Sequence, residues 1–147
     1  MKNINTDRLI DLIKQARLVF VCGNGGSSAT AEHFSNDLFS KGVKAHCLNS
    51  NTSIMTMIAN DFGYKHVFKK QLDVYASSKD LLIVFSCSGD SENVLEALKG
   101  NYTKVAILGN NGRVKNMADY VLTVDSDDYG GIENSHLEIV HTVKNKL

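Results

Sequence analysis

The stretch LVFVCGNGGSS, residues 18–28, joins a continuous apolar run to a glycine-rich loop that leads into a helix-period pattern. Unbroken apolar runs of this length are typical of parallel strands that are covered on both faces of a sheet. A second stretch of the same kind, LLIVFSCSGDS at residues 81–91, carries serines where the first carries mostly glycines. Two strand–loop–helix units of this form predict an α/β fold.

On both sides of these units, apolar strands alternate with helices along the chain. The patterns predict strands at 18–22, 43–48, 81–85, 105–108 and 120–124, helices at about 6–16, 28–41, 52–60, 64–76 and 92–98, a short helix ending at 118 and a last helix from about 132. We therefore expect a doubly wound five-stranded parallel sheet flanked by helices, of the flavodoxin-like type. The length of 147 residues suits a single domain, 1–147.

Both loops suit a phosphorylated ligand. Glycine lets backbone amides approach an anion closely, serine hydroxyls add donors without charge, and a following helix directs its positive dipole end at the same point. Ligands of such sheets bind at the carboxyl ends of strands, where both loops lie, so neighbouring strands would bring the loops to one pocket. The serines could instead serve as helix caps, but Ser86, Ser88 and Ser91 exceed the one cap that a helix start needs.

The loops do not match the common nucleotide-binding motifs. No Gly-Lys-Ser/Thr triplet occurs, which argues against a P-loop, and Gly23-x-Gly25 has Ser28 where the dinucleotide fingerprint has its third glycine. The following apolar run ends in Leu48-Asn49-Ser50, without a ribose-binding acidic residue. We therefore expect no nucleotide cofactor.

Composition narrows the classes of partner. Sixteen basic and sixteen acidic residues give a formal net charge of zero, which favours neither nucleic acid nor an anionic membrane as a partner. The polar N-terminus and the lack of a membrane-length apolar run predict a cytoplasmic protein. Three widely spaced cysteines argue against a disulfide framework, so we interpret Cys22 and Cys47 as buried thiols and Cys87 as small filler of the second loop.

Two later segments carry histidines beside carboxylates. His33 and Asp37 are four residues apart and share one helix face, and Glu133, His136 and His141 fall in the last predicted helix. Such groups suit acid/base chemistry or a metal, although solvated surface pairs are the common alternative. Glu133 and His141 would be about 12 Å apart along a helix. Either Glu133 precedes the helix, or the pocket is shared between subunits.

Five segments, in this order, resemble the sugar isomerase (SIS) domain, and within it the phosphoheptose isomerase family. They are Gly23-Asn24-Gly25-Gly26-Ser27, Ala31-Glu32-His33-Phe34, Asn60-Asp61-Phe62-Gly63, Ser86-Cys87-Ser88-Gly89-Asp90-Ser91-Glu92-Asn93-Val94 and Glu133-x2-His136-x4-His141. The resemblance runs from about Leu18 to the last residue. It implies a phosphosugar aldose/ketose isomerase that converts sedoheptulose 7-phosphate to D-glycero-D-manno-heptose 7-phosphate through an enediol, for lipopolysaccharide or capsule heptose. The alternative is a non-catalytic SIS module that binds a phosphosugar or a protein.

The resemblance also implies roles for residues. Phosphate would be bound by Ser86, Ser88 and Ser91, and the sugar by Asn24, Gly25, Gly26, Asn60 and Asp61, with Ser27 and Cys87 as further substrate-binding residues of the same loops. Asp37, Glu133 and His141 would be the catalytic groups. A zinc ion, one per site, would be bound by His33, Asp37, Glu133 and His141, as in some members of the family.

This chain departs from the family pattern in three ways. Asp37 stands where the family has a glutamate base, and Glu133 stands where it has a glutamine. Either Glu133 takes over as the base, or the four residues form a zinc site with two histidines and two carboxylates. The family's long N-terminal helical segment, which helps build a homotetramer with shared active sites, is reduced to a short helix. We expect a homotetramer or a dimer.

Overall fold

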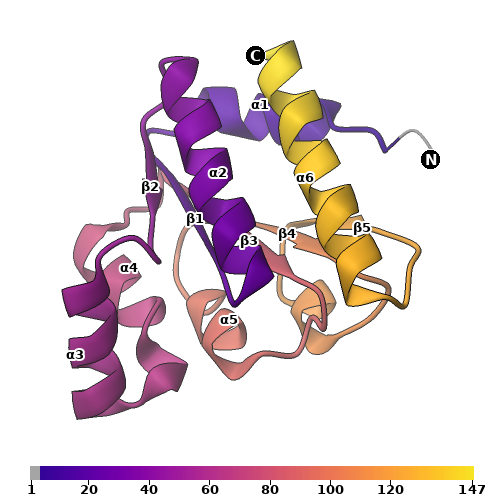
Figure 1. Cartoon of the computed structure of the whole chain (residues 1–147). Helices are drawn as coiled ribbons and strands as arrows, with labels where there is room; N and C mark the ends of the chain where they lie inside the picture. The colour runs from indigo at the N-terminus through magenta and orange to yellow at the C-terminus, as the bar shows by residue number, and fades with distance from the viewer. Residues whose placement is uncertain (1–3) are drawn as a thin grey trace.

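The computed structural model describes residues 4–147, and its sheet confirms the expected architecture. Five parallel strands lie in the order β2-β1-β3-β4-β5, as Figure 1 shows. Their bounds are β1 Val19–Gly23, β2 Ala45–Cys47, β3 Leu81–Ser86, β4 Thr103–Leu108 and β5 Tyr120–Thr123. The order places β1 beside β3 at the centre, with Gly23 opposite Phe85, so the two loops leave the sheet side by side.

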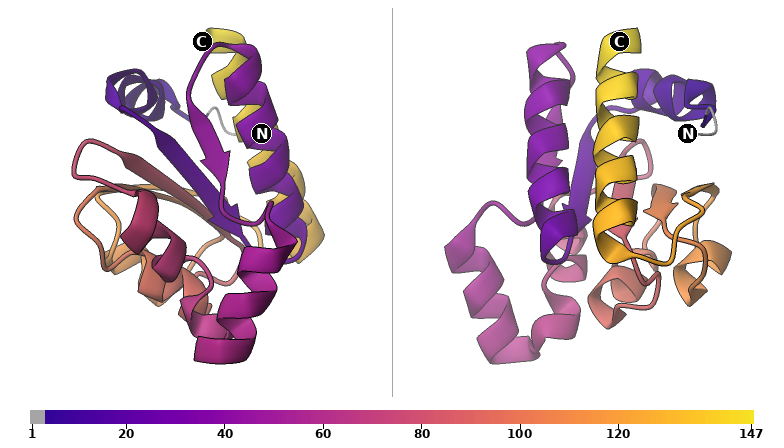
Figure 2. Two further views of the ribbon diagram at one scale, coloured as in Figure 1. Left: turned by 90° about the vertical axis from the view of Figure 1, so that its left-hand side faces the viewer. Right: turned by 45° about the vertical axis from the view of Figure 1, so that its right-hand side comes forward.

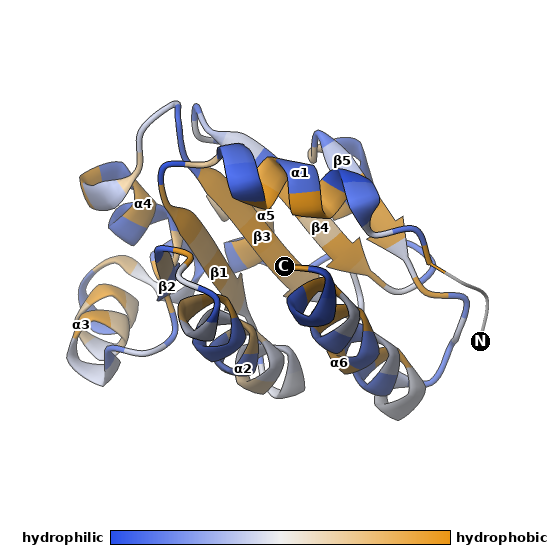
Figure 3. Cartoon of the chain, turned by 90° about the horizontal axis from the view of Figure 1, so that it is seen from above, coloured by the Kyte–Doolittle hydropathy of each residue, from blue (hydrophilic) through white to orange (hydrophobic). Residues whose placement is uncertain are grey.

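Helices cover both faces of the sheet, and their bounds follow the apolar periodicity. They are α1 Asp7–Gln15, α2 Gly26–Ser40, α3 Thr52–Phe62, η1 Tyr64–His66, α4 Lys69–Tyr75, α5 Glu92–Ala97, η2 Arg113–Asn116 and α6 Tyr129–Lys146. Buried side chains of α1, α2 and α6 form one core with one sheet face, and those of α3, α4 and α5 form a second core on the other face. Figure 3 shows the largely hydrophobic strands between these helix layers.

The pattern of burial explains why the central strands are uniformly apolar. Every residue of β1 and of β3 is buried, because each strand has a neighbour on both edges and helices on both faces. Helices α2 and α6 lie side by side on the same face, as Figure 2 shows, and both begin at the carboxyl edge of the sheet. Their first turns therefore meet the two loops.

Three expected boundaries were wrong. The last helix begins at Tyr129 because Asp128 caps it, accepting a hydrogen bond from the Gly131 amide at 2.8 Å. The helix expected at 64–76 is two pieces, η1 and α4, separated by Val67 and Phe68, whose complete burial overrides the continuous helical pattern. The strand expected at 43–48 is reduced to β2.

No helix within residues 4–147 is long and apolar enough to cross a membrane. Residues 1–3, with which the expected single domain begins, lie outside the described part of the chain. The assignment of residues 1–147 to a single domain stays a prediction.

Candidate functional site

The loops after β1 and β3 enclose one pocket together with the first turn of α6. Its lining residues are Asn24, Gly25, Gly26, Ser27, Phe85, Ser86, Cys87, Ser88, Ser91, Tyr129 and Glu133. The structure thus brings together all the loop residues assigned to substrate binding, as parallel strand ends predict. Tyr129 and Phe85 were missed, because neither belongs to a polar motif. None of the described residues that line this pocket is a lysine or an arginine.

The serines of the second loop present hydroxyl groups to the pocket. Ser86 Oγ accepts a hydrogen bond from the Gly89 amide at 2.9 Å, and Ser88 Oγ accepts one from the Asp90 amide at 3.2 Å. Ser91 is the N-cap residue of α5, and its side chain makes no capping hydrogen bond within the described chain. Because an accepting hydroxyl keeps its own proton, these groups can donate to an anion.

The segment at Gly112 and Arg113 packs against the serine loop and holds it in place. Gly89 and Gly112 both have positive φ, and a Cβ on Gly112 would lie 2.4 Å from the Gly89 carbonyl oxygen. The Val114 amide donates to that carbonyl at 2.9 Å. Arg113 donates to Asp90 Oδ1 from its amide at 2.9 Å and from Nε at 3.1 Å. These hydrogen bonds lower the pKa of Asp90, and the bond from the Arg113 amide has the largest effect. No sequence motif indicates this contact between the Gly112 turn and the serine loop.

Side-chain amides join the first loop to the second. Asn24 and Asn93 donate to each other, at 2.8 Å in both directions, and Tyr64 adds a hydrogen bond from its hydroxyl to Asn24 Oδ1 at 2.9 Å. Asn93 is buried at the start of α5, so this pair ties the loop after β1 to the helix after the serine loop. Asn24 therefore fixes the relative position of the two loops.

Glu133 packs directly on the first turn of α2. A Cβ added to Gly26 would lie 2.2 Å from Glu133 Oε1, so a larger residue at this position would displace the Glu133 carboxylate. Glu133 lies inside α6, which begins at Tyr129, and the alternative that it precedes the helix was wrong. Glu133 places a negative charge at the pocket, beside the N-terminal end of α2.

Cys87 is a half-buried thiol within the pocket. Its Sγ lies 3.9 Å from Ser27 Oγ, and burial, together with the smaller effect of Glu133, raises the pKa of the thiol while the Ser27 contact lowers it. A raised pKa favours the protonated thiol over the thiolate. Cys22 and Cys47 are buried, as expected.

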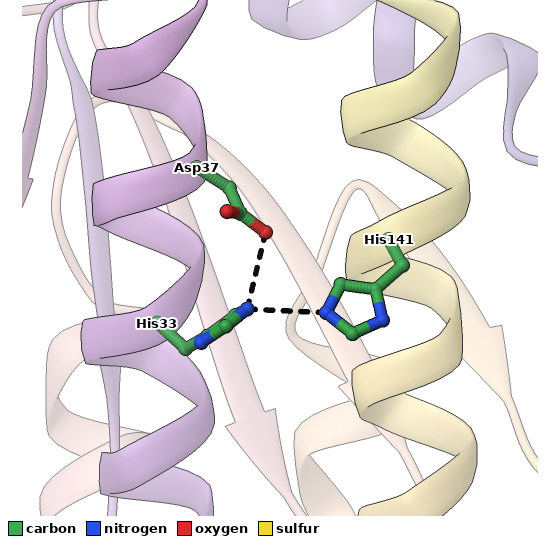
Figure 4. Close-up of side chains that lie close together, drawn as sticks. All are labelled: His33, Asp37 and His141. Atoms are coloured by element: carbon green, nitrogen blue, oxygen red, sulfur yellow. Dashed lines mark hydrogen bonds and ion pairs between the residues drawn. The ribbon is translucent and has the colours of Figure 1, made fainter.

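Further along the α2–α6 contact, three side chains converge (Figure 4). His33 Nε2 lies 3.1 Å from His141 Nε2 and 3.3 Å from Asp37 Oδ2. The three potential ligand atoms lie within 4.8 Å of one another. Asp37 is buried, whereas both histidines are exposed. Lys144 of α6 contacts the other carboxylate oxygen, with Nζ 2.9 Å from Asp37 Oδ1.

This donor set fits a zinc ion. Ligand atoms at the edges of a zinc tetrahedron are about 3.3 Å apart when the bonds are about 2.0 Å long, and both observed contacts are close to this spacing. Asp37 Oδ2 is buried without a hydrogen-bond partner in residues 4–147, which is the state of an oxygen available to a cation. Glu133 is not part of the group. Eight residues of α6 separate it from His141, about 12 Å along the helix.

Two residues expected to bind the sugar lie apart from the pocket. Asn60 and Asp61 are exposed near the end of α3, and Asn60 Nδ2 donates to Asp61 Oδ1 at 3.0 Å. Neither lines the pocket formed by the two loops. Their role in sugar binding stays a prediction.

His136 belongs to the core and not to the site. It is fully buried on α6, with Nε2 3.1 Å from the Leu108 carbonyl oxygen and the ring against Phe85. Burial lowers the pKa of His136, and the bond to Leu108 opposes this effect. The alternative of a surface position for His136 was wrong.

We expect His136 to make the protein less stable in mild acid. Because the pKa of His136 is lowered in the folded state, the unfolded chain binds the proton more readily. The stability that neutral His136 contributes is therefore lost as pH falls below the pKa of the unfolded chain, about 6.5. Urea unfolding of the wild type and of His136→Asn, at mildly acidic and at neutral pH, measures this contribution. A fall in unfolding free energy as steep in His136→Asn as in the wild type would contradict it.

The sequence matches one family model and resembles curated phosphoheptose isomerases. The family model described as SIS domain matches residues 3–104. A phosphoheptose isomerase of Campylobacter concisus is 38% identical over an alignment 144 positions long, which covers 90% of this chain and 76% of that protein. A phosphoheptose isomerase of Helicobacter pylori is 36% identical, over 90% of this chain and 75% of the relative.

Solved structures agree with the sequence matches. A phosphoheptose isomerase from Francisella tularensis superposes with a TM-score of 0.87 at 29% identity, over 95% of this chain and 84% of that one. The phosphoheptose isomerase GmhA from Neisseria gonorrhoeae gives a TM-score of 0.88 at 31% identity, over 94% and 79% of the two chains.

Proposed function

Because this chain belongs to the phosphoheptose isomerases of the SIS-domain family, we propose that it interconverts sedoheptulose 7-phosphate and D-glycero-D-manno-heptose 7-phosphate. The observation that carries the proposal is the placement of a serine-lined pocket and a histidine–carboxylate group along the same two helices, α2 and α6. A non-catalytic binding module is not favoured, since the relatives compared above are named as isomerases.

The phosphate group binds at the serine loop. Ser86, Ser88 and Ser91 donate hydroxyl protons, and the first turn of α2 at Gly25 and Gly26 adds the positive end of a fifteen-residue helix. The pocket attracts the phosphate through hydrogen bonds and dipoles instead of a basic side chain. Recognition is therefore local, which agrees with the zero net charge of the chain.

The reacting end of the sugar points along α2 and α6. Seven residues separate Gly26 from His33, about 10 Å along the helix, a span that suits an extended sugar chain. Isomerisation needs a base that removes a proton from the carbon beside the carbonyl and an acid that protonates the carbonyl oxygen. His141 is the acid/base histidine, and the carboxylate is that of Asp37 or Glu133.

His33, Asp37 and His141 would hold a zinc ion, one per site. Zinc, when bound, supplies a Lewis acid that polarises a carbonyl oxygen. Since α6 separates Glu133 from this group within one chain, Glu133 joins such a site only from a second copy of the chain. The homotetramer or dimer and the cytoplasmic location stay predictions.

We expect Ser88→Ala to weaken binding of the phosphosugar by about tenfold, because one hydrogen bond to a charged group is lost. Titration of sedoheptulose 7-phosphate into the protein, followed by calorimetry, measures the affinity. Ser77→Ala is the matched control, since Ser77 lies in the segment before β3, at the amino end of this strand and away from the serine loop at its carboxyl end. Equal affinities for Ser88→Ala and Ser77→Ala would remove Ser88 from the phosphate site.

A further inference from the structure

Lys144 contacts the buried carboxylate of the histidine–carboxylate group from outside that group. It follows His141 by three residues and therefore lies about one turn further along α6. Its Nζ is 2.9 Å from Asp37 Oδ1, while Asp37 Oδ2 faces His33 Nε2 at 3.3 Å. The two carboxylate oxygens thus have different partners, a lysine on one and the potential metal position on the other.

Asp37 is buried, so its negative charge needs a positive charge beside it, and Lys144 is that charge. The Asp37 side chain is 2% exposed, whereas that of Lys144 is 37% exposed. A carboxylate removed from water needs a compensating charge, and breaking a buried pair on one side leaves the other charge uncompensated. Lys144 supplies this charge from the chain itself, so the carboxylate is compensated without any metal ion.

The same charge opposes a metal ion. A dication held by neutral His33 and His141 and by ionised Asp37 would have net charge +1, and the nearby ammonium of Lys144 would repel it. A divalent cation and Lys144 therefore compete for one carboxylate. The flexible, half-exposed lysine side chain can move its ammonium into water when the ion binds, but its contact with Asp37 is then weakened.

We propose that Lys144 is the internal counter-ion of Asp37 and that it lowers the affinity of this site for zinc. The inference rests on the metal site of the proposed function. It adds a residue that sets the metal affinity and makes the metal-free site a stable state of the protein. Zinc occupancy then depends on the metal supply and not only on the ligand set.

The test is zinc affinity in metal-free protein, measured by competition with a chromophoric chelator at neutral pH. We expect Lys144→Met and Lys144→Gln to bind zinc about tenfold more tightly than the wild type. Glutamine keeps a donor for Asp37 Oδ1 without the charge, so it remains informative where methionine prevents folding. Lys144→Arg keeps the charge and is expected to match the wild type.

Lys146→Met is the matched control for net charge. Lys146 lies two residues further along α6 and contacts exposed Asp7 with Nζ 3.0 Å from Oδ1. We expect its zinc affinity to equal that of the wild type. We also expect the melting temperature of metal-free Lys144→Met to be lower than that of metal-free Lys146→Met. Zinc should raise the melting temperature of Lys144→Met more than it raises the melting temperature of the wild type.

Unchanged or weaker zinc binding in both Lys144→Met and Lys144→Gln would overturn the proposal, as would absence of zinc binding in the wild type and in both variants. Zinc binding by the variants alone would support it in its strongest form. None of these measurements uses turnover. A failure of isomerase activity would therefore contradict the proposed function and leave the competition between Lys144 and zinc standing.

Discussion

We expect His141→Ala to lower turnover of sedoheptulose 7-phosphate by about a thousandfold, the usual contribution of a positioned acid/base group, and to leave phosphosugar binding nearly unchanged. The physical reason is the separation of the two ends of the site. The serine pocket touches Glu133, eight residues earlier on α6, whereas His141 lies beside His33. Loss of the imidazole therefore removes the proton-transfer group without altering the phosphate contacts.

The fold tolerates this change. His141 is exposed, and α6 is held to the sheet by Ile139, Val140 and Val143 on its buried face. Rates are compared by following the sugar signals with NMR, and binding by ligand-induced thermal stabilisation. His66→Ala is the matched control, because His66 lies in η1 and has no part in the histidine–carboxylate group. Retained turnover in His141→Ala would discard the assignment of His141.

We expect Gly112→Ala to lower the unfolding free energy by about 3 kcal/mol and to weaken phosphosugar binding. Two effects combine here. Gly112 has φ +121°, which L side chains rarely adopt, and an added Cβ would lie 2.4 Å from the carbonyl carbon and oxygen of Gly89. Because Gly89 belongs to the serine loop, relief of this clash must displace the loop that binds phosphate.

A second glycine separates the two effects. Gly42 also has positive φ, at +77°, but among residues 4–147 nothing lies within 4 Å of its Cβ position. Gly42→Ala therefore measures backbone strain alone, about 1 kcal/mol, and we expect it to leave phosphosugar binding intact. Urea unfolding and ligand titration of both variants give the comparison. If Gly112→Ala is as stable as Gly42→Ala and binds equally well, the contact between the Gly112 turn and the serine loop does not contribute.

Most of the fold could be predicted from the sequence because every residue of the central strands β1 and β3 is buried, which makes their apolar runs unbroken. The glycine loop and the serine loop mark where these two strands end. The break between η1 and α4 could not be predicted, because Val67 and Phe68 fit a helical period and only tertiary packing interrupts the helix. The start of α6 was missed because Asp128 follows a run of polar residues with no distinct cap signal.

The candidate site was predictable where motifs are local. The serine loop and the His33–Asp37 pair each lie within a few residues, and the structure brings each together as expected. Contacts across the chain were not predictable in this way. Lys144 lies one turn after His141, yet no spacing rule indicates that it reaches Asp37 on another helix. Arg113 looks like a free surface cation in the sequence, but it is bonded to Asp90.

We expect this chain to be an isomerase, and an NMR time course of the zinc-supplemented wild type with sedoheptulose 7-phosphate measures that activity. An aldoheptose 7-phosphate should appear with the wild type and be nearly absent with His141→Ala, while the sugar thermally stabilises both proteins. If the sugar stabilises the wild type and no aldose product forms, this chain is a phosphosugar-binding module and not an isomerase.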